Sequence, residues 1–306
     1  MKEPFGLENI GSTCYINTAL QCLFSDPLFV KQLEPGACDP TSPLFSALCT
    51  LYNEPSKQNM HQFVRQLHKS LGKFMDFKTQ NDMQEFLLLF LDEINKELKV
   101  NRNPNKRPHL KDAFADYLRK EWNRHHKDGQ SWIVPHFHGQ TITQIKCPSC
   151  NKIFHNAEVF TSLDLDVTAN TLEQMIESHF AGDKIEGWRC DRCNSVANEI
   201  KRTVKATRLP HTLIVTLKRF GDRMSDHTHY PEYLVIPQPL HIYKQEIKYK
   251  LVAVGSHIGC SIGGHYFATT IRNEGKEYMV DDEAVGDEGV MREQRNAYVL
   301  FYTLAD

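Results

Sequence analysis

Two Cys-x-x-Cys pairs place the strongest constraint on how this chain can fold. They read Cys147-Pro-Ser-Cys150 and Cys190-Asp-Arg-Cys193. Two residues between thiols let one tight turn present both sulfurs to a metal, and two such turns complete a tetrahedron. This spacing predicts one structural zinc ion and requires two distant segments to meet. Because four thiolates leave no open coordination position, such a zinc would stabilise the fold and would not be a catalyst.

The other readings of these cysteines are weaker. The chain has nine cysteines, an odd number, and its first residues, MKEPFGLENIG, contain no apolar secretory segment. These features favour free thiols and metal over disulfides, in a cytoplasmic or nuclear protein. A redox site would need only one pair. A nucleobase deaminase would need Pro before the first cysteine and an upstream His-x-Glu, whereas here the proline follows Cys147 and no suitable His-x-Glu precedes it.

Composition excludes several other classes of protein. Of the 306 residues, 41% are apolar and 24% are charged, an ordinary globular balance. The formal net charge of −2 gives no indication of a nucleic-acid or membrane-surface partner. The most apolar run, FLLLFL at 86–91, is too short to cross a bilayer. We therefore expect no nucleic-acid or membrane partner, and we expect a monomer.

The pattern of apolar residues changes along the chain. Helical spacing over 60–71 and 83–98 predicts two helices, and another follows a polar, basic connector at 99–109. From about residue 140 the segments are mainly β-branched or alternating, with one short helix expected over 171–180. Helices followed by mostly antiparallel strands predict an α+β fold.

Cys14 lies in the stretch GLENIGSTCYINTALQCLF, residues 6–24. The apolar spacing behind it predicts a helix that begins near Cys14 and ends at Ser25-Asp26-Pro27. At a helix N-terminus, unpaired N–H groups and the helix dipole favour a thiolate. The alternative is a buried small hydrophobic residue, the usual state of a free cysteine. Only a partner base elsewhere in the chain can distinguish these readings.

A thiol nucleophile needs a histidine to accept its proton and a polar group to orient that histidine. Among fifteen histidines, His265 follows Gly263 and Gly264 at the start of an alternating strand. Glycines at such a point would let a substrate backbone approach closely. Asp281 and Asp282 end the next strand. A hairpin would therefore bring residues 265 and 281 side by side.

These motifs together resemble those of a known family. The pattern Gly-Leu-x-Asn-x-Gly-x-Thr-Cys-Tyr-x-Asn at 6–17 resembles the cysteine box of the ubiquitin-specific proteases, and Gly264-His265-Tyr266 followed by Asp281-Asp282 resembles their histidine box. The intervening matches occur in family order: Gln80-x-Asp82-x-x-Glu85-Phe86, the two cysteine pairs, Leu217-Lys218-Arg219-Phe220 and the terminal AYVLFY. The resemblance covers nearly the whole chain.

The resemblance implies a papain-like cysteine peptidase formed by a single catalytic domain over residues 1–306. It implies a helical thumb at 1–125, zinc-bearing fingers and the start of a palm at 140–220, and the remaining palm at 221–306. The implied activity is that of a deubiquitinase, which hydrolyses isopeptide or peptide bonds after the C-terminal glycine of ubiquitin. The implied partners are ubiquitin and ubiquitinated proteins.

The resemblance also implies roles for individual residues. The nucleophile, general base, orienting carboxylate and oxyanion-hole amide fall on Cys14, His265, Asp281 and Asn9. The second carboxylate, Asp282, would face the oxyanion side or solvent, because neighbouring strand residues point to opposite faces. The arginine-bearing tail of ubiquitin would meet Asp82 and pass a slot beside Gly263 and Gly264.

The sequence departs from the family pattern where a tryptophan usually precedes the aspartate pair, since residues 277–280 here read Glu-Tyr-Met-Val. Three other functions stay open. One is a protease for a ubiquitin-like modifier, and another is a ubiquitin-binding scaffold without activity. The third, a plain zinc-knuckle adaptor, would leave Cys14, His265 and Asn9 without a role.

Overall fold

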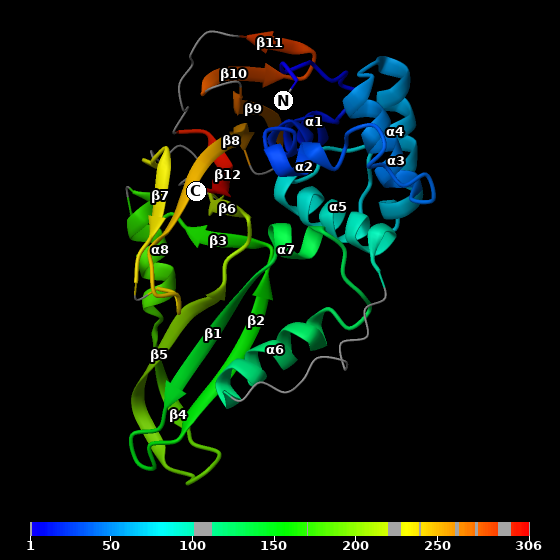
Figure 1. The fold of residues 1–306 in the computed structure, drawn as a ribbon. Coiled ribbons are helices and arrows are strands. Elements are labelled where there is room, and N and C mark those ends of the chain that lie inside the picture. The colour runs from blue at the N-terminus through cyan, green and yellow to red at the C-terminus, as the bar shows by residue number, and fades with distance from the viewer. Residues whose placement is uncertain are drawn as a thin grey trace.

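The computed structural model describes residues 2–100, 112–169, 171–219, 228–238, 240–260, 263–272, 275–286 and 295–305. A helical layer lies beside an eight-stranded sheet, and a four-stranded sheet extends away from both (Figure 1). Most of the connector predicted over 99–109 lies outside the described residues. The observed architecture is α+β, as the sequence predicts.

The helical layer is built from the first part of the chain. Its five helices are α1 (Cys14–Leu23), α2 (Pro27–Lys31), α3 (Pro43–Asn53), α4 (Lys57–Leu71) and α5 (Met83–Leu98). The predicted helices over 60–71 and 83–98 are therefore confirmed as α4 and α5. All ten residues of α1 are buried, because this helix contacts α5 on one side and strands of the larger sheet on the other.

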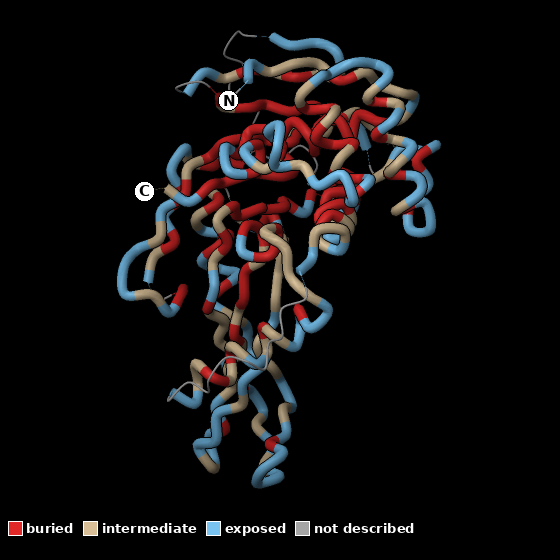
Figure 2. The backbone as a smooth tube through the Cα atoms, turned by 45° about the vertical axis from the view of Figure 1, so that its right-hand side comes forward, coloured by how far each residue is buried: buried red, intermediate tan, exposed pale blue. Residues whose placement is uncertain are grey.

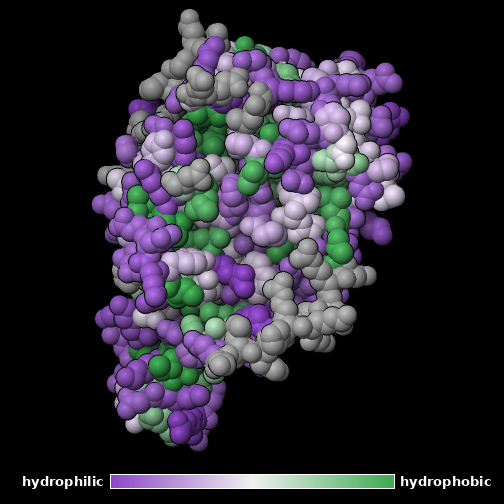
Figure 3. Space-filling model, viewed as in Figure 1, coloured by the Kyte–Doolittle hydropathy of each residue, from purple (hydrophilic) through white to green (hydrophobic). Residues whose placement is uncertain are grey.

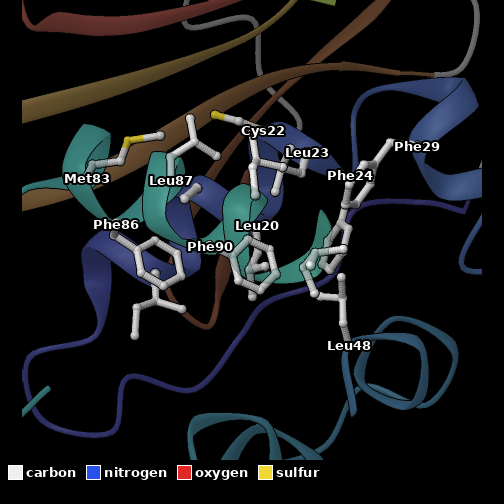
Figure 4. Close-up of a cluster of buried hydrophobic side chains, with 14 of the residues drawn as sticks. Leu20, Cys22, Leu23, Phe24, Phe29, Leu48, Met83, Phe86, Leu87 and Phe90 are labelled. Carbon is white, nitrogen blue, oxygen red and sulfur yellow. The ribbon is translucent and has the colours of Figure 1, made fainter. Parts of the chain in front are cut away.

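The core around α1 is densely packed (Figure 4). Leu20 and Leu23 of α1 belong to the same buried cluster as Phe86, Leu87 and Phe90 of α5. The rings of Phe86 and Phe90 are stacked with centroids 5.5 Å apart. Because buried side chains in such cores occupy well-defined rotamers, this packing holds the N-terminus of α1 at a defined position.

The eight-stranded sheet follows the order β11-β10-β9-β8-β12-β6-β3, with β7 paired to β8. Described neighbours pair antiparallel except β3 and β6, which are parallel. The helix α8 (Leu172–Ala181) contacts β3. The strands are β3 (Ser162–Asp166), β6 (Thr212–Lys218), β7 (Tyr233–Ile236), β8 (Ile247–Cys260), β9 (Gly263–Arg272), β10 (Lys276–Asp281), β11 (Ala284–Gly286) and β12 (Ala297–Leu304).

The four-stranded sheet follows the order β2-β1-β5-β4. Most of its residues are exposed or half-buried (Figure 2), and polar side chains dominate the surface at its far end (Figure 3). The helix α6 (Ala113–His125) packs on β2, so it lies apart from α1–α5. The strands are β1 (Gly139–Lys146), β2 (Ile153–Phe160), β4 (Lys184–Arg189) and β5 (Val196–Arg208).

One buried carboxylate joins three parts of the fold. Asp26 caps α2 by accepting hydrogen bonds from the N–H groups of Leu28 and Phe29. It also accepts from Thr212 of β6 at 2.5 Å and contacts Nε2 of His136, in the short helix α7 (Ile133–Phe137), at 2.5 Å. Although burial alone would raise the pKa of Asp26, the contacts with His136 and Thr212 lower it below the ordinary value. The helical layer, α7 and the larger sheet are thus connected through one side chain.

The sequence favours free thiols and metal over disulfides, and this preference is wrong at one position. Cys38, in the loop before α3, is bonded to Cys49 in that helix, with their Cα atoms 6.3 Å apart. The loop folds back on α3 and brings the two thiols within bridging distance, which linear spacing does not reveal. The other seven cysteines are free.

Among the described residues, no helix is both long enough and apolar enough to cross a membrane.

Candidate active site

Cys14 is the first residue of α1, where the sequence predicts it. The preceding loop is held by its own side chains, because Asn9 Oδ1 accepts a hydrogen bond from the Thr13 N–H at 3.1 Å and Thr13 Oγ1 accepts one from the Ile10 N–H at 2.9 Å. Gly11 has a φ of +98°, a conformation that glycine adopts readily. The cysteine is only 3% exposed. The loop and helix therefore hold the thiol in a fixed, nearly buried place.

The pKa of the Cys14 thiol is raised, although its place at a helix N-terminus alone would lower it. Burial raises the pKa of the thiol above its ordinary value, and the negative charge of Asp282 raises it further. Backbone N–H groups of Tyr266, Tyr15 and Cys14 itself lower the pKa without offsetting burial. The helix N-terminus does favour the thiolate, but desolvation dominates in this structure. The Tyr266 N–H also brings the thiol against β9, next to His265.

His265 and Asp281 form a hydrogen-bonded pair. His265 lies near the start of β9 and Asp281 ends β10, and these strands form the antiparallel hairpin expected from the sequence. His265 Nε2 lies 2.5 Å from Asp281 Oδ1. Both side chains remain more than two-fifths exposed. Because Asp281 engages Nε2, the other ring nitrogen, Nδ1, is the one left to exchange a proton with a thiol.

Asp282 binds the loop that precedes Cys14, while one of its carboxylate oxygens stays within 4.8 Å of the His265 and Asp281 atoms that could share a ligand with it. Its φ of +49° is uncommon for a residue other than glycine. The two carboxylate oxygens accept hydrogen bonds from Asn9 Nδ2 and Asn17 Nδ2, each at 2.7 Å. Its backbone oxygen accepts from the Leu7 N–H at 2.8 Å. The two aspartates thus have different hydrogen-bond partners, since Asp281 engages the imidazole and Asp282 engages Asn9 and Asn17.

Two residues of this network carried no predicted role. Asn17 lies one helical turn after Cys14 and is buried, and Glu283 Oε1 accepts a hydrogen bond from the Asn9 N–H at 2.9 Å. The spacing of three residues between Cys14 and Asn17 places them on one helix face and was the available signal for Asn17. No local pattern links Glu283 to residue 9. Gly6 is also required here, because a Cβ at this position would lie 2.2 Å from the backbone carbonyl oxygen of Glu283.

Asp82, which the resemblance places against the tail of ubiquitin, makes its hydrogen bonds within this chain. Its Oδ1 caps α5 by accepting from the N–H groups of Gln84 and Glu85. Its Oδ2 accepts a hydrogen bond from the Tyr298 hydroxyl at 2.7 Å, and the Tyr266 hydroxyl lies 3.5 Å away. In this structure the carboxylate therefore joins α5 to β9 and β12.

Of the two glycines before His265, Gly264 is closely surrounded by protein atoms. A Cβ on Gly264 would lie 2.3 Å from His257 Nε2, so a side chain would collide with β8. Gln80 and the Gly264 backbone exchange two hydrogen bonds, at 2.9 and 3.1 Å. Among the described residues other than its chain neighbours, Gln80 Oε1 is the one atom within 4 Å of a Cβ built on Gly263, at 3.1 Å. The close approach is thus made by this chain's own strand at Gly264, and Gln80 connects the loop before α5 to β9.

A pocket of about 390 Å³ opens beside the loop that carries Asn9. It lies between the N-terminal segment, the start of α4 and the turn after Asp282. Its lining residues are Gly6, Leu7, Glu8, Pro55, Ser56, Lys57 and Glu283.

The four cysteines of the two Cys-x-x-Cys pairs meet at the far end of the four-stranded sheet. Their sulfurs lie within 4.8 Å of one another, with Cys147–Cys193 and Cys150–Cys190 separations of 3.8 Å. A tetrahedral zinc with Zn–S of about 2.3 Å separates its sulfurs by roughly 3.8 Å. This agreement shows that the cysteine cluster fits a zinc ion.

The two pairs are built alike, although they are distant in sequence. Asn151 and Asn194 each follow the second cysteine and have φ values of +56° and +59°. Their N–H groups donate to the carbonyl oxygens of Cys147 and Cys190 at 3.0 and 2.8 Å. Asparagine tolerates this left-handed conformation, so each pair closes as the same tight turn.

Comparison with known proteins agrees with this architecture. Solved structures of a SAGA DUB module that contains Ubp8, Sgf11, Sus1 and Sgf73, one bound to monoubiquitin and one to ubiquitin aldehyde, each contain a chain of the same fold, with a TM-score of 0.76. The identities are 23% and 22%, over 99% of this chain and 69% and 70% of those chains. At this level of identity the likeness is one of fold.

The sequence comparisons define the family. The profile described as "Ubiquitin carboxyl-terminal hydrolase" matches residues 5–302. This chain therefore belongs to the ubiquitin carboxyl-terminal hydrolase family, whose members are cysteine-type deubiquitinases.

Individual relatives are similar over nearly all of this chain. It is 27% identical to "Probable ubiquitin carboxyl-terminal hydrolase 4" of Schizosaccharomyces pombe, over 98% of this chain and 58% of that protein. It is 26% identical to "Ubiquitin carboxyl-terminal hydrolase 4" of Arabidopsis thaliana, over 92% of this chain and 84% of that protein. The chain thus spans little more than half of the fission-yeast relative.

Proposed function

We propose that this chain is a deubiquitinase that cleaves the bond after the C-terminal glycine of ubiquitin by thiol chemistry. The observation that carries the proposal is the His265–Asp281 pair, with the Cys14 thiol at the N-terminus of α1 held by the N–H of Tyr266, the residue after His265, in a chain of this family. A buried thiol, an imidazole with one nitrogen engaged by a carboxylate and an adjacent amide loop match the requirements of nucleophilic acyl transfer.

The proposed reaction starts when His265 Nδ1 accepts the proton of Cys14. The sulfur then attacks the carbonyl carbon of the terminal glycine, and the imidazolium gives its proton to the departing amine. Water attacks the resulting thioester with the imidazole as base, which restores the thiol and releases the carboxylate. Asp281 would hold the ring in the required tautomer and orientation.

The negative oxygen formed in this attack needs hydrogen-bond donors. Asn9 is the proposed side-chain donor. One of its two Nδ2–H bonds is directed to Asp282, and a primary amide has a second. The N–H of Cys14, at the first position of α1, has no partner within the helix and is a second candidate. Asp282 and Asn17 would act indirectly, by holding the Asn9 loop in place.

We also propose the wider assignments that the family resemblance implies. The single domain would divide into a thumb, fingers and a palm at 1–125, 140–220 and 221–306. The cysteine cluster would hold one structural zinc through Cys147, Cys150, Cys190 and Cys193, and would have no place in the reaction. Asp82, Gly263 and Gly264 would border the path of the ubiquitin tail, although Asp82 would have to exchange its tyrosine contacts for an arginine. The chain would act as a monomer in the cytoplasm or nucleus.

The test is the release of a fluorescent amine from ubiquitin carrying it on its C-terminal carboxyl group. Turnover by wild type is expected, whereas no release above background would contradict the proposal. Parallel reactions with probes of ubiquitin-like modifiers that carry a C-terminal electrophile distinguish the main alternative. Faster labelling by a modifier than by ubiquitin would transfer the function to that modifier, and binding without turnover would indicate a scaffold.

A further inference from the structure

We propose that His125, His126 and His138 form a second zinc site, distinct from the cysteine cluster, at the base of the four-stranded sheet. One ring nitrogen from each lies within 4.8 Å of the others. His125 ends α6, His126 is its C-cap, and His138 lies between α7 and β1. Three neutral imidazoles are a recurrent zinc ligand set, with a fourth position left for water or a carboxylate.

The hydrogen bonds of His126 fix its protonation in the form that a metal needs. Its Nδ1 lies 2.9 Å from the Trp122 carbonyl oxygen, which can only accept, so Nδ1 carries the proton. A backbone carbonyl in this position is the usual partner of the second nitrogen of a metal-bound histidine. Nε2 of His126 therefore carries a free lone pair, and it lies 3.0 Å from His138 Nδ1.

The separation of the two rings is close to that of a filled site. Zinc–nitrogen bonds of about 2.0–2.1 Å place two tetrahedral ligands roughly 3.3 Å apart. The observed 3.0 Å would have to widen by only a few tenths of an ångström. The proton on His138 Nδ1 would move to its own Nε2, so this ring stays neutral and no net proton is released.

The charges around the three rings are mixed, because a helix terminus and Asp92 attract a cation whereas Arg208 opposes it. The C-terminal end of a helix attracts positive charge, and Asp92 of α5 interacts electrostatically with His138. The positive charge of Arg208 opposes a cation here. Its guanidinium lies against the Trp122 ring, 4.6 Å from the ring centroid. His125 is exposed and can rotate to complete the site.

A zinc ion here would have a structural effect that the cysteine cluster cannot supply. The helix α6 lies on β2, and His138 directly precedes β1, so the ion would fasten both elements where the four-stranded sheet leaves the rest of the fold. The cysteine cluster holds the opposite end of the same sheet. The sheet would then be fixed by metal at both ends.

The test is zinc binding by the whole 306-residue chain in a Cys14→Ala background, which removes the nucleophilic thiol as a ligand. Metal analysis after gel filtration, followed by calorimetric titration with ZnCl₂, should give two equivalents. Cys190→Ser should lose one, while His125→Ala and His138→Ala should each lose the other. Loss of a ligand is expected to weaken this binding by more than the roughly 10–100-fold that loss of an outer hydrogen-bond partner costs.

Controls keep the result decisive. His68, an exposed histidine on α4, should be replaceable by alanine with both equivalents retained. Because His125 is exposed, His125→Ala tests the site even if His138→Ala fails to fold. The proposal is overturned if wild type binds one equivalent only, or if the second equivalent survives His125→Ala. It is also overturned if His265→Ala abolishes the second equivalent, which would place the ion beside Asp281 and Asp282.

Discussion

Cys14 and the four clustered cysteines present the same side chain in two contrasting regions. Cys14 begins α1, and packing from α5 and the eight-stranded sheet surrounds it. The cluster lies at the end of a sheet whose strands are largely exposed (Figure 2). Cys193 itself is exposed. Where side-chain packing holds the backbone, a thiol is available for chemistry; where packing is thin, thiols can supply the missing stability through a metal.

Replacement of Cys14 should give the largest effect and separate the two regions most clearly. Cys14→Ala is expected to lose at least about 10⁴-fold in turnover, because no other group can form the thioester. Its unfolding free energy should change by about 1 kcal/mol or less, since one small side chain is shortened. Release kinetics and thermal unfolding measure the two effects.

Cys22 is the matched control for this prediction. It lies in the same helix and is fully buried, and burial raises its thiol pKa far above the ordinary value. Cys22→Ala should therefore keep most of the activity. If Cys14→Ala still cleaves at a rate comparable to wild type, the assignment of Cys14 as the nucleophile is wrong.

The two aspartates should behave differently within the catalytic region. Asp281→Ala is expected to lose on the order of 10²-fold or more in kcat, because His265 loses the partner that orients it. Asp282→Ala should lower kcat less. It should lower the free energy of unfolding more, by about 1–3 kcal/mol, because the partly buried hydrogen bonds from the Asn9 and Asn17 side-chain amides are lost. Kinetics with unfolding curves on both variants measure this, and a larger rate loss from Asp282→Ala would reverse the assignment.

Changes in the cysteine cluster should give the opposite pattern. Cys147→Ser or Cys190→Ser is expected to lower the melting temperature and expose the four-stranded sheet to proteolysis before it affects the chemical step. The reason is that metal-binding energy is also folding energy, about 10 kcal/mol or more in isolated zinc peptides. About one zinc per chain should be lost from the cluster in each variant. An unchanged melting temperature and metal content would contradict a structural zinc there.

The smallest expected effect is a shift in the pH dependence of Cys14. Burial and the Asp282 charge both hold the thiol pKa above its ordinary value. Asp282→Asn removes the charge, so the pKa should fall and the thiolate should form at lower pH. The rate of alkylation by iodoacetamide, measured against pH in the Cys22→Ala background, should have its midpoint at lower pH in the variant. A midpoint that stays in place or rises would mean that the carboxylate does not act on the thiol.

Local and repeating patterns explain what the sequence could predict. Helical spacing after Cys14, the hairpin that pairs His265 with Asp281 and the two Cys-x-x-Cys turns each depend on a short stretch or a simple register. The structure has all three arrangements. The four-cysteine meeting point was predictable because metal geometry brings distant segments together.

The remaining features depend on packing between distant segments. The position of α6 on β2, the disulfide between Cys38 and Cys49, and the contact of Gln80 with Gly264 have no local signal. The raised pKa of Cys14 has the same origin, since the helix N-terminus is visible in the sequence but the depth of burial is not. For the same reason Asp82 could be recognised as a motif residue, while its hydrogen bond with Tyr298 could not.

The central claim is that Cys14 attacks the C-terminal carbonyl of ubiquitin, and a covalent probe tests it most directly. Wild-type protein is incubated with ubiquitin that carries an electrophile at its C-terminus, and intact mass and peptide mapping locate the adduct. The account predicts one ubiquitin per chain, attached to Cys14, with labelling lost in Cys14→Ala and strongly slowed in His265→Ala. An adduct at Cys22 or Cys260, or equal labelling of Cys14→Ala, would contradict it.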